Sequence, residues 1–133
     1  MKVYIFGNED LEFDNKAIKT AKALENTLEH CDFIYIKPNQ DLPFVCEEEV
    51  VIMDTIEGIE DIKIINNDQV KNISLEERTT VHDFDLGFQL KYLKKIGKLG
   101  KVTIIGLPVA KDVDYLRIQS ILRKLVAQDI QGS

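Results

Sequence analysis

Acidic residues and one histidine follow short apolar runs at three places in the sequence. Asp54 directly follows the apolar run 50–53, and His82 with Asp83 follows the short β-type run 79–81. The first apolar run ends at a polar stretch that contains Gly7, Asn8, Glu9, Asp10, Glu12 and Asp14. Two carboxylates and an imidazole suit a borderline divalent ion such as Zn²⁺ or Ni²⁺, with coordination positions left open for a substrate. The residue types therefore indicate a site that contacts a metal ion.

Strands that end at a common edge are needed to bring these residues together. Apolar runs predict five strands, at 1–6, 33–36, 50–53, 62–65 and 102–105. Apolar residues at helical spacing predict three helices, at about 15–29, 83–96 and 113–127. Continuous apolar strands that alternate with helices are typical of a parallel sheet covered on both faces. We therefore predict an α/β fold, a three-layer sandwich with a mostly parallel central sheet of about five strands and helices on both faces.

Ligands of such sheets bind beyond the carboxyl ends of the strands. Asp54, His82 and the acids after Gly7 are therefore expected at one edge of the sheet. Each residue alone has a simpler explanation. Asp54 could cap the segment that follows it, and Asp14 or Asp83 could lie at a helix N-terminus, where the helix dipole favours a carboxylate. The coincidence of all three at one edge favours a functional site.

Length and composition narrow the class of protein. The 133 residues predict one domain, residues 1–133. The net charge of −6 argues against nucleic acid as a partner, because phosphate contacts need a basic surface. We find neither a signal peptide nor the roughly 18 consecutive apolar residues of a membrane helix, so we expect a cytoplasmic protein without a membrane partner. Cys31 and Cys46 lack metal-type spacing, and no glycine motif for phosphates is present.

Four stretches of the sequence resemble one known family. They are VYIFGNEDLEFDNKAIKTAKALE, VVIMDT, HDFDLGFQL and KVTIIGLP, in that order along the chain. Together they resemble the maturation endopeptidases of nickel–iron hydrogenases, which have an α/β fold. In that family a Gly-Asn pair and an acidic turn follow the first strand, an Asp ends an apolar strand, and a His begins a helix.

The resemblance implies both a reaction and a set of site residues. Such enzymes remove a short C-terminal extension from the hydrogenase large-subunit precursor after nickel has been inserted. The nickel travels with the precursor and is recognised there, so no tightly bound cofactor is expected. By position, the family's metal-contacting and catalytic residues correspond to Asp14, Asp54 and His82. Asp83 is then a candidate for orienting the His82 imidazole.

Two alternatives remain open on the sequence. The loop after the second strand reads IKPNQDLPF, where the family has an Asp-Gly-Gly-Thr type of loop. A diverged, non-catalytic member that binds nickel or the precursor without cutting it is therefore one alternative. The other is a receiver-like signalling domain, with Asp54 as phosphoacceptor and Lys111 after the last strand. Such a domain would have no use for His82.

Overall fold

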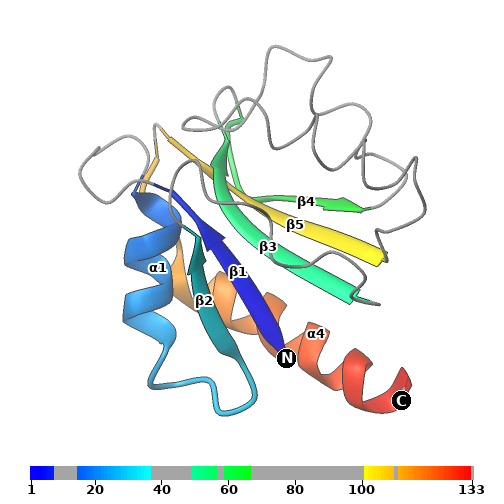
Figure 1. The fold of residues 1–133 in the computed structure, drawn as a ribbon. Helices are drawn as coiled ribbons and strands as arrows, with labels where there is room; N and C mark the ends of the chain where they lie inside the picture. The colour runs from blue at the N-terminus through cyan, green and yellow to red at the C-terminus, as the bar shows by residue number, and fades with distance from the viewer. Residues whose placement is uncertain (8–14, 37–48, 57–58, 67–100, 110, 133) are drawn as a thin grey trace.

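A five-stranded mixed sheet lies at the centre of the computed structural model, which describes residues 1–7, 15–36, 49–56, 59–66, 101–109 and 111–132 (Figure 1). Its strands are β1 (Lys2–Phe6), β2 (Asp32–Ile36), β3 (Glu49–Ile56), β4 (Lys63–Asn66) and β5 (Lys101–Pro108). Their order across the sheet is β2-β1-β3-β5-β4. Neighbouring strands are parallel except for β4, which pairs with β5 in the antiparallel direction. The predicted α/β fold with a mostly parallel, five-stranded sheet is confirmed.

The two central strands explain why the sheet forms. β3 and β5 are buried at every residue after the first, and their apolar residues are mostly Val, Ile and Leu. Branched side chains of this kind are typical of strands that are covered on both faces. The pairing of β3 with β5 runs over eight residues, from Glu49 opposite Lys101 to Ile56 opposite Pro108. This long pairing fixes the two carboxyl ends side by side.

Two described helices, α1 (Lys16–Leu24) and α4 (Tyr115–Gly132), cover one face of the sheet and touch each other (Figure 1). They bury their apolar sides against Val3, Ile5, Val51, Met53, Ile105 and Leu107. The opposite face presents a second apolar cluster, formed by Tyr4, Phe6, Ile36, Val50, Ile52, Ile56, Ile65, Val102 and Ile104. The helix predicted at 83–96 lies outside the described residues.

Several predicted element boundaries were wrong, including the end of the last helix, which continues to Gly132 beyond the predicted end at Ala127. The first helix ends at Leu24 instead of Glu29, because the amide and hydroxyl of Thr27 both donate to the Leu24 carbonyl and close a tighter turn. β3 was predicted to stop before Asp54 and β5 before Gly106, yet the two strands continue to Ile56 and Pro108. Their backbone pairing continues through both positions, which outweighs the local preference of Asp and Gly for turns.

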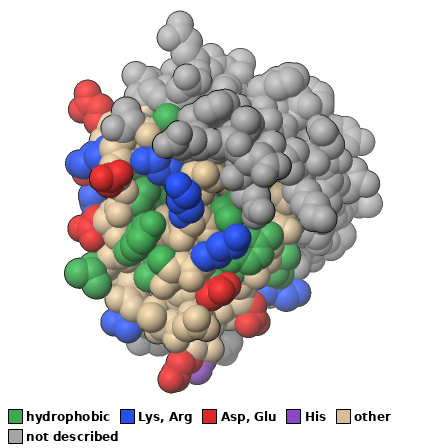
Figure 2. Space-filling view, turned by 90° about the vertical axis from the view of Figure 1, so that its left-hand side faces the viewer, with side chains coloured by type: hydrophobic (Ala, Val, Ile, Leu, Met, Phe, Trp, Pro, Cys, Tyr) green, Lys and Arg blue, Asp and Glu red, His purple; other side chains and the backbone are tan. Residues whose placement is uncertain are grey.

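The described surface mixes charges of both signs. On the face shown in Figure 2, Lys and Arg side chains lie beside Asp and Glu side chains and among scattered hydrophobic ones. Within the described residues, no helix is both long and apolar enough to cross a membrane.

Candidate active site

Asp54 is the predicted site residue that the structure describes, and it lies near the carboxyl end of β3. Its side chain is fully buried, with 0% of the residue exposed to solvent. In the sheet it pairs with Gly106 of β5. By the alternation of side chains along a strand, it lies on the same face as Ile52 and Ile56. Burying a carboxylate is costly unless it is hydrogen-bonded or paired, so its presence here marks the position as a functional candidate.

The backbone orients this carboxylate. Asp54 Oδ1 accepts a hydrogen bond of 2.8 Å from the amide of Thr55. A carboxylate held by an amide of its own strand has a fixed direction, which suits it for contacting a ligand beyond the strand end. The sequence thus predicted Asp54 at the carboxyl ends of the strands, where it lies. It placed the residue just after β3, whereas the structure has it within β3.

Gly106, which pairs with Asp54 on the neighbouring strand, is closely packed against the side chain of Ile56. A Cβ atom built on Gly106 would lie 2.4 Å from Ile56 Cδ1 and 3.2 Å from Ile56 Cγ1. The absence of a side chain at residue 106 therefore lets Ile56 pack across β5. This packing holds the ends of β3 and β5 together directly beside the buried acid.

Asp14, His82 and Asp83 lie outside the described residues. The structure therefore does not test whether they approach Asp54. It does describe Asn15, which is buried, lies just before α1 and accepts a hydrogen bond from the Lys19 amide through its carbonyl. Because α1 begins at the carboxyl edge of the parallel strands, the chain next to Asp14 enters this edge as predicted. In the described part of the chain, no three His, Cys, Asp or Glu side chains are arranged to share a metal ion.

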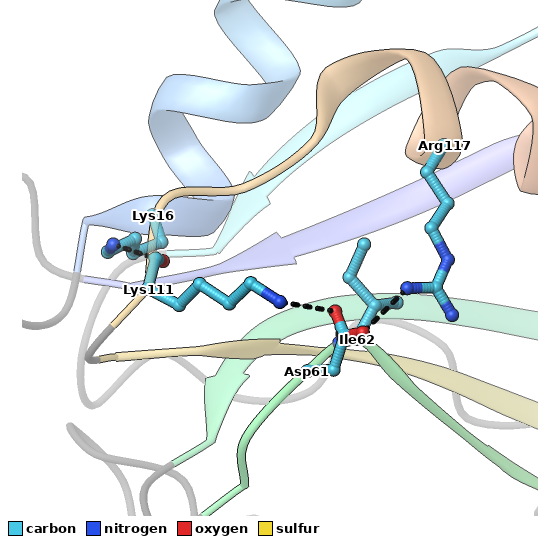
Figure 3. A network of polar contacts seen from close by, with 5 residues as sticks. All are labelled: Lys16, Asp61, Ile62, Lys111 and Arg117. Carbon is cyan, nitrogen blue, oxygen red and sulfur yellow. Dashed lines mark hydrogen bonds and ion pairs between the residues drawn. The ribbon is translucent and has the colours of Figure 1, made fainter.

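Sequence reasoning missed one charged cluster at the same edge. Asp61, just before β4, accepts a 2.9 Å hydrogen bond from Arg117 Nη1 and lies 3.8 Å from Lys111 Nζ (Figure 3). A hydrogen bond from the Ile62 amide, followed by the one from Arg117, holds the pKa of the Asp61 carboxyl below its usual value. No sequence pattern marks Asp61, because its partners lie about fifty residues further along the chain.

A cavity of about 390 Å³ opens at the opposite edge of the sheet. It is lined by Thr27, Leu28, Glu29, His30, Cys31, Arg123, Val126 and Ala127. Burial raises the pKa of the Cys31 thiol, which keeps it protonated and weakly nucleophilic at neutral pH. The cavity lies at the amino end of β2, because residues 27–31 of its lining directly precede that strand. Asp54 lies near the carboxyl ends of the parallel strands. The cavity is therefore not the predicted site.

Comparisons with known proteins agree with this fold. A family model described as hydrogenase maturation protease, HycI, matches residues 33–132. The solved [NiFe] hydrogenase maturation protease HybD from Thermococcus kodakarensis is similar with a TM-score of 0.68 and 20% identity, over 95% of this chain and 99% of that one. The hydrogenase maturating endopeptidase HybD from E. coli has a TM-score of 0.61 and 14% identity, over 99% of this chain and 91% of that one. No curated protein matches.

An α/β peptidase is the class of protein that these observations define. The family model covers well over half of the chain, and the chain therefore belongs to the hydrogenase maturation protease family. At identities of 14–20%, the solved structures show the shared fold. The receiver-like alternative does not fit this topology. Receivers have the sheet order 2-1-3-4-5, whereas here β5, which follows β4 in the sequence, lies between β3 and an antiparallel β4.

Proposed function

We propose that this chain is an endopeptidase that removes a C-terminal extension from the nickel-loaded large-subunit precursor of a nickel–iron hydrogenase. The observation that carries the proposal is a fully buried Asp54 at the carboxyl edge of the sheet, in a chain of the hydrogenase maturation protease family. The precursor is the partner and its nickel is part of the substrate. The reaction is proposed to take place in the cytosol.

Asp14, Asp54 and His82 are the residues proposed to contact the nickel of the precursor. Carboxylate and imidazole ligands suit Ni²⁺, and a metal ion of this kind can polarise a peptide carbonyl for attack by water. The Thr55 amide supports the role of Asp54, because it fixes the direction of the carboxylate before any substrate arrives. Asp83 is proposed to orient the imidazole of its neighbour His82.

Cleavage of the nickel-loaded precursor by purified protein tests the proposal. Asp54→Asn, Asp14→Asn and His82→Ala should each lower the cleavage rate by at least about 10- to 100-fold, as expected for the loss of a metal contact. Asp54→Asn keeps the size of the side chain and an oxygen that can accept from the Thr55 amide, so it removes the charge with little effect on packing.

Two substitutions away from this edge serve as matched controls. Asp32→Asn and His30→Ala change exposed residues near the amino end of β2 and should leave cleavage within about twofold of the wild type. Equal losses in the controls and the site variants would contradict the assignment of the three residues. Tight binding of the precursor without any cleavage would instead favour the non-catalytic alternative.

A further inference from the structure

Asp61 uses both of its carboxylate oxygens to join separate parts of the chain. Oδ2 accepts a 2.9 Å hydrogen bond from Arg117 Nη1, in the first turn of α4. Oδ1 accepts a 2.8 Å hydrogen bond from the Ile62 amide and lies 3.8 Å from Lys111 Nζ. In Figure 3 the Lys111 and Arg117 side chains approach Asp61 from two sides. One carboxylate therefore holds the segment before β4 against the segment after β5.

A second contact extends this cluster to α1. The Nζ atom of Lys16 donates a 2.7 Å hydrogen bond to the Lys111 carbonyl (Figure 3). Lys16 is the first residue of α1 and follows Asn15 directly. The cluster thus connects the segments that follow β1, β3 and β5, although these segments are far apart in the sequence. We call Lys16, Asp61, Lys111 and Arg117 the rim clamp.

The rim clamp lies at the edge of the sheet that carries Asp54. The carboxyl ends of β1, β3 and β5 share this edge because the three strands are parallel. Gly106 pairs with Asp54 on one side and with Lys63 on the other, and Asp61 lies two residues before Lys63. The rim clamp therefore joins described residues at the same edge of the sheet that carries Asp54.

Stability alone does not account well for this arrangement. The Asp61 and Arg117 side chains are about half exposed, at 51% and 49%. Ion pairs that are exposed to solvent add little to folding stability, because water and salt screen them. A cluster that joins the start of α1, the residues before β4 and the start of α4 is better suited to fixing the relative positions of these parts of the chain.

We propose that Asp61 is a positioning residue of the peptidase: through the rim clamp it holds the start of α1, the residues before β4 and residues 111–117 in the arrangement that binds the precursor. This inference rests on the proposed function, because it assigns the edge around Asp54 to precursor binding. Asp61 acts through Arg117 and Lys111 and makes no contact with the reacting atoms.

Asp61→Asn tests the proposal with two separate measurements. The first is amide hydrogen exchange, which should become faster in residues 111–117 of the variant, because the amide of Asn cannot form the same charged pairs. The second is the interaction with the nickel-loaded precursor. We expect Kd and KM to rise by about 3- to 10-fold while kcat stays within about twofold, the pattern of lost binding without lost chemistry.

Glu60→Gln is the matched control, since it removes the same charge one residue away. Glu60 is exposed and has no hydrogen bond or ion pair within the described part of the chain, so exchange and Kd should match the wild type. Arg117→Lys keeps a positive charge near Asp61 and should restore most of the affinity that Arg117→Gln loses. Asp61→Asn combined with Arg117→Gln should lose little more than either change alone, because both remove the same contact.

Three outcomes would overturn the inference, and each is distinct. Unchanged exchange in Asp61→Asn would show that the rim clamp does not hold residues 111–117, whatever the activity of the protein. Faster exchange with unchanged Kd and KM would show that the clamp has no role in precursor binding. A wild-type chain that neither binds nor cleaves the precursor would contradict the proposed function, and with it the role of Asp61, while the exchange rates would still decide whether the clamp exists.

Discussion

Thr55, the neighbour of Asp54, shows how a single side chain affects this edge of the sheet. It is fully buried, and within the described part of the chain its hydroxyl has no hydrogen-bond partner. A buried hydroxyl that makes no hydrogen bond destabilises the folded state, because it has lost its contacts with water. Its amide, in contrast, holds the Asp54 carboxylate. The backbone of Thr55 therefore serves the site, whereas its side chain costs stability.

Thr55→Val should raise the free energy of unfolding by about 1 kcal/mol, because Val keeps the branched shape and removes the buried hydroxyl. Equilibrium urea unfolding measures the change. Thr20→Val is the matched control, since Thr20 is equally buried but its hydroxyl donates a 2.7 Å hydrogen bond to the Lys16 carbonyl. This second variant should lose about 0.5–1.5 kcal/mol. Equal effects in the two variants would contradict the explanation.

At the scale of secondary-structure elements, the ends of β3 and β5 pack tightly against each other. Gly106 is the point of closest approach, because a Cβ atom there would lie 2.4 Å from Ile56 Cδ1. Gly106→Ala should therefore lower the free energy of unfolding by about 1–3 kcal/mol, the usual cost of overpacking. Thermal or urea unfolding measures this loss.

Removing the obstructing atom should rescue the variant. Ile56→Val deletes Cδ1, so in the double variant the added methyl group at residue 106 meets less of the neighbouring side chain. We expect the double variant to be more stable than the sum of the two single changes predicts. Additive effects of the two substitutions on the free energy of unfolding would show that contact between residues 106 and 56 is not the source of the instability of Gly106→Ala.

These same strand ends show what the sequence could predict. Apolar runs located the five strands that the structure describes, because strands buried on both faces need continuous apolar residues. The predicted ends at Met53 and Ile105 were too early, since Asp and Gly favour turns when they are judged by local preference alone. In the structure Asp54 and Gly106 pair with each other, and this contact between distant residues keeps both strands extended.

At the scale of the whole molecule, the candidate site was predictable in part. The rule that ligands bind at the carboxyl ends of parallel strands selects Asp54 without any contact information. It does not select Asp61, whose contact with Arg117 joins residues 56 positions apart. Nor does it select the contact of Lys16 with Lys111, which spans 95 positions. Residues on strand ends follow from local patterns, whereas the loops that arrange them depend on the folded chain.

The dependence of folding stability on alkaline pH is a property of the whole molecule, and the pair of Tyr35 and Glu25 contributes to it. Partial burial of Tyr35, which stays 38% exposed, followed by the charge of Glu25 and the hydrogen bond to it, raises the pKa of Tyr35 to about 12. The unfolded chain has a tyrosine pKa of about 10, so it releases this proton first as the pH rises. Tyr35 therefore stabilises the fold fully below about pH 10, and the contribution is lost between about pH 10 and 12.

Tyr35→Phe removes the contribution of Tyr35 to this dependence, because Phe has no proton to release. We expect the wild type to be the more stable of the two at pH 9, and the difference between them to shrink as the pH rises to 11. Urea unfolding at pH 9, 10 and 11 measures both curves.

Glu25→Gln should weaken the dependence without abolishing it, since burial of Tyr35 is the larger cause of the raised pKa. Glu29→Gln removes the same charge from an exposed residue four positions away and should leave the wild-type curve unchanged. A constant difference in the free energy of unfolding between the wild type and Tyr35→Phe from pH 9 to 11 would show that the Tyr35 pKa is not raised. The contact of Tyr35 with Glu25, which follows α1, would then not make stability depend on pH.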